Sequence, residues 1–160
     1  MTVFPRPNGT APTTRLSELT PLNARFVHYL RLWEEGETGV SRISEELTGH
    51  LGPAKGERVA EIWCALCDLL AQYGHRPPEI LPAGSTGITG DEAGFAQLVA
   101  LAAETRREDA MFAALMMVRP DITPIVISLA TQAGLSIRQS DLCAQARPRP
   151  ASHHGTARLH

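Results

Sequence analysis

Apolar residues recur at steps of three and four along most of the chain, the spacing of an amphipathic helix rather than of a strand. The first such segment begins at Thr20-Pro21 and ends at Gly36. A threonine followed by proline is a typical helix start, because the hydroxyl caps the first turn and proline fits the first helical position. Its apolar stripe consists of Leu19, Leu22, Phe26, Tyr29, Leu30 and Trp33.

Five further segments show helical spacing or helix-start signals. We expect helices over Val40–Leu51, Ala54–Tyr73, the residues after the capping box Thr89-x-x-Glu92, a fifth segment around Met111–Met116, and a sixth from Thr123-Pro124 to Gly134. No stretch alternates apolar and polar residues as a strand would. The pattern therefore predicts an all-α fold, a compact bundle of about six helices. The long 75–90 loop could divide the bundle into two three-helix halves.

The two ends of the chain lack this periodicity. Residues 1–16 are rich in Pro, Thr, Gly and Asn, and residues 143–160 read "CAQARPRPASHHGTARLH". Polar segments with few apolar residues cannot bury enough surface to offset the entropy of ordering. We expect both ends to be disordered and residues 17–142 to form a single α-helical domain.

Composition and charge indicate which kinds of partner are unfavourable for this protein. The 160 residues are 43% hydrophobic and 20% charged, with a net charge of −2. Residues 17–140 carry 10 Lys or Arg and 16 Asp or Glu, so the body is acidic. An acidic body argues against nucleic acid as a partner. No apolar run reaches the ~20 residues needed to cross a bilayer. We expect a cytoplasmic protein without a membrane partner.

A C-x-x-C pair is the main candidate for chemistry. Trp63-Cys64-Ala65-Leu66-Cys67 resembles the W-C-x-x-C motif of thioredoxin-type oxidoreductases. In that family the first cysteine follows a strand and opens a helix, whose N-terminus stabilises the thiolate. Here the pair falls in the middle of a predicted helix, and no βαβ pattern surrounds it. We therefore reject a thioredoxin-like role.

The helical positions of the two cysteines favour packing. At 100° per residue, Ala60, Cys64, Cys67 and Ala71 form a stripe of small residues beside the broad apolar face that contains Trp63. Free cysteine behaves as a small hydrophobe, and small residues allow close approach of a second helix. The alternative is a thiol or zinc site in which Cys64, Cys67 and His75 are ligands. No residue fixes the fourth ligand, so no cofactor is assigned.

Residues 41–63 have the outline of a helix–turn–helix. Lys55 and Arg58 would then lie at the start of the recognition helix. Glu57 and Glu61, however, would face the phosphates. DNA binding is therefore the third hypothesis, after an interaction protein and a thiol or zinc protein.

The fifth segment and the 75–90 loop favour interaction with another protein or self-association. Met111, Phe112, Leu115 and Met116 fit one buried stripe, whereas Met117 lies off it and offers a second contact surface. The loop is long for a connection within a bundle, and long ordered loops are often functional. His75 and Arg76 begin it, and Arg76 could anchor an acidic partner. We expect a non-catalytic adaptor, regulator or assembly factor, with no catalytic residue assigned.

Overall fold

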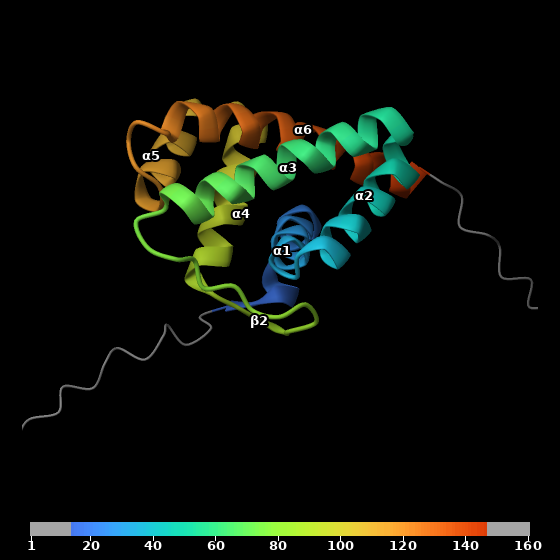
Figure 1. Cartoon of the computed structure of the whole chain (residues 1–160), viewed down its shortest axis with the longest axis horizontal. Coiled ribbons are helices and arrows are strands. Elements are labelled where there is room, and N and C mark those ends of the chain that lie inside the picture. Colours follow the sequence, from blue (N-terminus) through green and yellow to red (C-terminus); the bar gives the residue numbers. More distant parts are fainter. Residues whose placement is uncertain (1–13, 147–160) are drawn as a thin grey trace, which may run out of the picture.

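The structure, a computed structural model, describes residues 14–146. Within this range lie the helices α1 (Pro21–Glu34), α2 (Glu37–Leu51), α3 (Pro53–Tyr73), α4 (Gly90–Ala103), α5 (Arg107–Met117) and α6 (Thr123–Ala146). A 3-10 turn at Leu16–Glu18 precedes α1, and the two-residue strands β1 (Thr14–Arg15) and β2 (Gly87–Ile88) pair in antiparallel fashion. Figure 1 shows the helices packed against one another, which confirms the all-α bundle expected from periodicity.

The helix starts read from the sequence are confirmed in atomic detail. The Thr20 hydroxyl accepts a hydrogen bond of 3.2 Å from the Asn23 amide, and Pro21 is the first residue of α1. At α4 the capping box is complete: the Thr89 hydroxyl accepts from the Glu92 amide, and the Glu92 carboxylate accepts from the Thr89 amide. Each cap satisfies amides that the first turn leaves without a helical partner.

A single glycine joins α2 to α3. Gly52 has a φ of +88°, a left-handed conformation that glycine adopts without the penalty of a side chain. Beyond it, Gly56 in α3 lies against the backbone of Thr48 in α2, where an added Cβ would come within 2.4 Å. The absence of a side chain at Gly56 therefore sets how closely the two helices approach.

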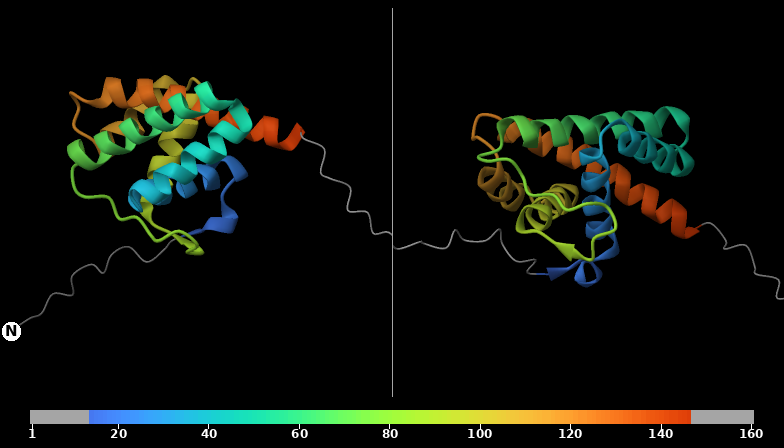
Figure 2. Two further views of the ribbon diagram at one scale, coloured as in Figure 1. Left: turned by 45° about the vertical axis from the view of Figure 1, so that its right-hand side comes forward. Right: turned by 60° about the horizontal axis from the view of Figure 1, so that its bottom comes forward.

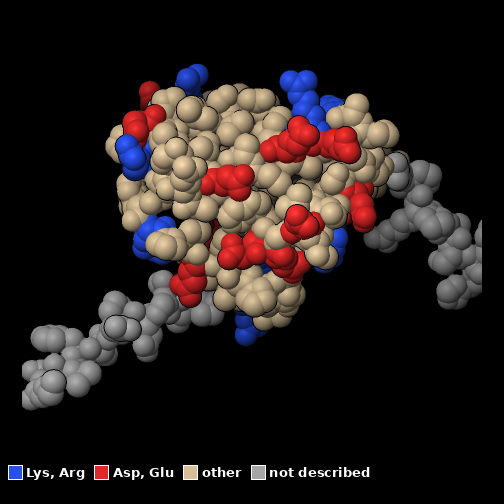
Figure 3. Space-filling view, in the orientation of Figure 1, with Lys and Arg blue, Asp and Glu red and all other residues tan. Residues whose placement is uncertain are grey.

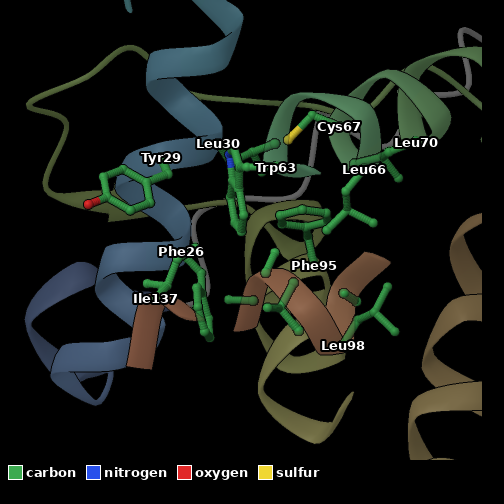
Figure 4. Packing of buried hydrophobic residues seen from close by; sticks show 14 of the residues in the cluster. Phe26, Tyr29, Leu30, Trp63, Leu66, Cys67, Leu70, Phe95, Leu98 and Ile137 are labelled. Carbon is green, nitrogen blue, oxygen red and sulfur yellow. The ribbon is translucent and has the colours of Figure 1, made fainter. Parts of the chain in front are cut away.

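An aromatic cluster lies at the centre of the core. Trp63 of α3 has an exposed fraction of 0%, and its ring stacks on Phe26 and meets Tyr29 and Phe95 edge to face. The ring centroids are 5.4–6.0 Å apart, in the range of favourable aromatic pairs. Figure 4 shows side chains of α1, α3, α4 and α6 meeting around this cluster.

The buried residues form one cluster, and the six helices are not divided into two halves. The reason is α6, which contacts α2, α3, α4 and α5 and so links the helices on both sides of the 75–90 loop. Figures 1 and 2 show α6 running along one edge of the molecule from α5 to α2. The 75–90 loop therefore does not divide the bundle into the two halves considered above, because a loop's length alone does not separate packing units.

The sixth helix does not end at Gly134. It continues to Ala146, and Gly134 is buried at its contact with α4. A Cβ on Gly134 would lie 3.0 Å from Val99 and from Ala103, so glycine permits a close helix crossing rather than a left-handed stop. The helix also passes residue 142, the expected end of the domain, and includes Cys143. Residues 1–13 and 147–160, parts of the expected disordered ends, lie outside the described residues.

Candidate functional site

The first candidate region is the 75–90 loop, whose beginning is attached to the end of α5. The His75 amide donates to the Met117 carbonyl over 3.1 Å, and the exposed His75 ring lies 2.9 Å from the Leu115 carbonyl through Nε2. Gly74 and Val118 form an isolated antiparallel bridge beside this contact. These bonds place His75 next to the last turn of α5.

Arg76 has an acidic partner within the chain. Its guanidinium makes two hydrogen bonds of 2.8 Å to the carboxylate of Asp91, in the fork geometry that favours arginine. Asp91 also accepts the Glu79 amide over 2.7 Å. The Arg76 side chain is 64% exposed, so this ion pair is a surface contact. The residue proposed from sequence to bind an acidic partner is thus engaged at the start of α4.

A buried ion pair fixes the rest of the loop. Arg31 of α1 lies 2.7 Å from Glu92 of α4 through Nε and Oε1, and both side chains are at most 2% exposed. Arg31 also donates to the carbonyls of Ser85 and Gly87, over 2.8 and 2.6 Å. A buried charge is tolerated when it is paired and its remaining donors are bonded, and Arg31 meets both conditions.

Glu92 completes this network from the other side. Besides Arg31 and the Thr89 amide, its carboxylate accepts the Leu81 amide over 3.0 Å. The sequence analysis recognised Glu92 only as a capping residue and did not single out Arg31. Nothing in local spacing links two residues 61 positions apart. The polar groups of the loop are therefore largely used to hold the loop on α1 and α4.

The third residue proposed for interaction, Met117, is turned toward the core. It is partly buried and packs against the hydrophobic cluster, with its sulfur beside Gly94 of α4. Its backbone carbonyl is the group that accepts the His75 amide. Met117 and His75 are thus close together, but the methionine side chain is not a separate exposed surface.

The outer face of α5 differs from the sequence expectation. Phe112 is 70% exposed and Met116 is 80% exposed, while Ala110 and Ala114 on the opposite side are fully buried. We call Phe112 and Met116, one turn apart, the α5 apolar face. The prediction of one buried stripe was wrong for these two residues, although Met111 and Leu115 are partly buried. Small alanines allow α5 to lie close to its neighbours, so the larger side chains point outward.

The cysteine pair lies in the middle of α3. Cys67 is fully buried in the core beside Trp63 and Leu66, as Figure 4 shows, and Cys64 is partly buried. Burial raises the pKa of the Cys64 thiol and raises that of Cys67 well above its usual value. Both thiols are therefore held in the protonated form, which is the weaker nucleophile and the weaker metal ligand.

The small-residue stripe is only partly used for packing. Ala60 and Cys67 are buried, whereas Ala71 is exposed. Within residues 14–146, no group of three or more His, Cys, Asp or Glu side chains could hold a metal ion. His153 and His154 near the end of the chain, which could supply a further zinc ligand, lie outside the described residues.

The helix–turn–helix outline corresponds to α2 and α3, which are joined at Gly52. Lys55 donates a hydrogen bond of 2.5 Å to Gln139 of α6. Glu57 and Glu61 are exposed on the same helix as Lys55. Figure 3 shows acidic side chains gathered over the middle of one face, where α2 and α3 lie, with the basic ones mostly near its edge.

No helix among the described residues combines the length and the hydropathy needed to cross a bilayer. Comparison of the chain with protein-family models, curated protein sequences and solved structures gives no match.

Proposed function

We propose that this protein is a non-catalytic helical interaction protein, an adaptor, regulator or assembly factor, and that the α5 apolar face binds its partner. The observation that carries the proposal is the exposure of Phe112 and Met116, two large apolar side chains one turn apart. Adjacent exposed apolar residues are a feature of protein-binding surfaces. Covering each side chain would recover about 1.5–3 kcal/mol of hydrophobic free energy.

The surroundings of the α5 apolar face favour a particular kind of partner. Exposed Glu108 lies one turn before Phe112. The exposed His75 ring lies within hydrogen-bonding distance of the carbonyl of Leu115, the residue that precedes Met116. Methionine adapts its shape to different partners. A helical segment of another protein, with one or two apolar side chains and a nearby lysine or arginine, matches this arrangement.

Two properties of α5 support a binding role over a structural one. Its inner side is filled by Ala110 and Ala114, so the helix is anchored without the two outer side chains. Its last turn is also held by the bonds from His75 to the Leu115 and Met117 carbonyls. A partner would therefore meet a face that is already positioned, which lowers the entropic cost of binding.

The test begins with a photo-crosslinking amino acid placed at Phe112, to trap and identify the partner. Binding of that purified partner is then measured by isothermal titration calorimetry to the wild type and to a variant with Phe112→Ser and Met116→Ser. We expect the affinity to fall at least about tenfold, because a few central apolar residues contribute most of the binding free energy of an interface. The matched control is Gln97→Ser, an exposed change on α4. Equal affinity of the wild type and the double variant would refute the proposal.

A further inference from the structure

Six exposed positions of α6 follow the spacing of a coiled-coil seam. They alternate steps of three and four residues, and we call them the α6 seam: Ile125, Ser128, Gln132, Leu135, Gln139 and Leu142. The apolar members are 53%, 39% and 60% exposed for Ile125, Leu135 and Leu142. The opposite side of α6 is the buried side, so the helix has one face in the core and a second apolar-containing face in solvent.

The α6 seam carries no charged residue. Its polar members are a serine and two glutamines, which can be hydrogen-bonded across an interface without the desolvation cost of an ion. The acidic residue near its end, Asp141, lies off the seam and is paired with Arg25 of α1. Other exposed helix faces of this protein carry many charged residues. The lack of charge on the α6 seam therefore favours contact with another helix.

The order of residues makes the α6 seam complementary to itself. If a second copy of α6 lies antiparallel, with a two-fold axis between Ala133 and Gly134, each seam position meets one position of the second copy. Ile125 meets Leu142, Ser128 meets Gln139, and Gln132 meets Leu135. Apolar residues therefore meet at both ends, Ser128 and Gln139 can hydrogen-bond to each other, and Leu135 packs against the aliphatic part of Gln132.

Lys55, a basic residue beside the seam, favours one of the two possible directions. Lys55 of α3 is bonded to Gln139, at one end of the seam. In a parallel pair, the two copies of Lys55 would lie at the same level and repel each other. In an antiparallel pair, each lies at the level of Ser128 of the second copy, about 16 Å along the axis from the other Lys55.

A shallow cleft lies beside the seam, where side chains of a second helix could enter. It has a volume of about 600 Å³ and lies between α3 and α6. Val59 and Ile62 of α3 and Leu135 of α6 contribute apolar lining, Gln132 lies next to them, and Lys55 and Arg58 of α3 also line the cleft. Gln132 and Leu135 are also the residues nearest the proposed axis. A second copy would therefore cover apolar side chains of both helices.

We propose that this chain forms an antiparallel homodimer through the α6 seam. The dimer goes beyond the proposed role of α5 and rests on different residues, so either proposal can fail without the other. The three polar side chains between the apolar ends, Ser128, Gln132 and Gln139, make the contact weaker than that of an obligate dimer. Figure 1 shows α6 along the edge of the molecule, where a second copy can approach.

The test measures molar mass by sedimentation equilibrium over a range of concentrations. We expect the wild type to approach twice the mass of one chain at about 100 μM, in the range of moderate interfaces. Ile125→Lys and Leu142→Glu each place an unpaired charge in the interface, and should raise the dissociation constant about 100-fold. Both positions are exposed in the single chain, so the variants should keep the wild-type circular dichroism spectrum and melting temperature.

Combining the changes distinguishes the antiparallel arrangement from the parallel one. In an antiparallel dimer, Ile125→Lys of one chain meets Leu142→Glu of the other, so the double variant should regain dimer formation. The same pairing predicts that a mixture of the two single variants forms a heterodimer. A monomeric wild type, or a double variant as weak as the singles, would overturn the proposal. Phe112→Glu on α5 is the control and should leave the dimer unchanged.

Discussion

The 75–90 loop is bonded to the last turn of α5, yet the loop and the α5 apolar face use their side chains in opposite ways. The loop is polar and long, and its polar groups are bonded within the chain, to buried Arg31 and Glu92 and, at the surface, to Asp91. On the α5 apolar face, Phe112 and Met116 remain in solvent. The polar loop is therefore not the surface that is free to bind a partner, because its polar groups already have hydrogen-bond partners within the chain. The outward-facing apolar side chains of α5 have none among the described residues.

The most disruptive way to test this comparison is to remove the cation that holds the loop. Arg31→Met leaves Glu92 buried without its counter-ion and removes the donors to the Ser85 and Gly87 carbonyls. Loss of one partner of a buried pair costs about 3–5 kcal/mol. We expect this loss in the free energy of unfolding, measured by urea denaturation. A change below about 1 kcal/mol would mean that the loop does not depend on this pair.

A second experiment contrasts the two sides of α5. Ala114 is fully buried, and Ala114→Leu adds three carbon atoms to a packed contact, which should cost about 1–3 kcal/mol. Phe112→Ser, on the exposed side, should change the stability by less than about 0.5 kcal/mol. Thermal unfolding followed by circular dichroism measures both. If Phe112→Ser proved the more costly change, the phenylalanine would belong to the core and the assignment of the α5 faces would be reversed.

A third experiment addresses the exposed part of the loop. Arg76→Ala removes the ion pair with Asp91, whose arginine side chain is 64% exposed. Exposed pairs contribute up to about 1 kcal/mol, and salt screens them. We expect a small loss of stability that shrinks further when the unfolding is measured at high salt. Arg42→Ala, an exposed arginine of α2, is the comparison variant, and an equal loss in both would show that the Arg76–Asp91 pair adds nothing.

The last experiment leaves the fold intact and follows thiol chemistry. Burial raises the pKa of Cys67 well above its usual value, which keeps the thiolate scarce, and burial also blocks access of the reagent. Alkylation by iodoacetamide at about pH 8, located by peptide mass spectrometry, should modify Cys67 at least about tenfold more slowly in the folded protein than in urea. Fast modification of Cys67 in the folded protein would restore the thiol hypothesis.

Features set by neighbouring residues could be predicted from the sequence. The starts of α1 and α4 depend on Thr20-Pro21 and on Thr89 with Glu92, and each involves residues within one turn. Helical periodicity likewise gave the all-α class. Local signals were sufficient here because the hydrogen bonds concerned are local.

Features set by distant residues could not be predicted in this way. A glycine after an apolar stripe is a common helix stop, but Gly134 is required by Val99 and Ala103 on another helix. Ending α6 at Gly134 also hid the α6 seam, half of which lies beyond that residue. The buried side of α5 was predicted wrongly because large apolar side chains, Phe112 and Met116, were expected to lie in the core. The small residues Ala110 and Ala114 are buried there instead.

The position of α6 in the chain has a consequence for synthesis on the ribosome. Val126, Ala130, Ala133 and Ile137 of α6 fill the core between helices made earlier. Until these residues emerge from the exit tunnel, the inner faces of α3 and α4 lack their cover and expose apolar surface. The growing chain therefore completes its core in a late step, and a translational pause before residue 123 prolongs the period in which chaperones can bind it.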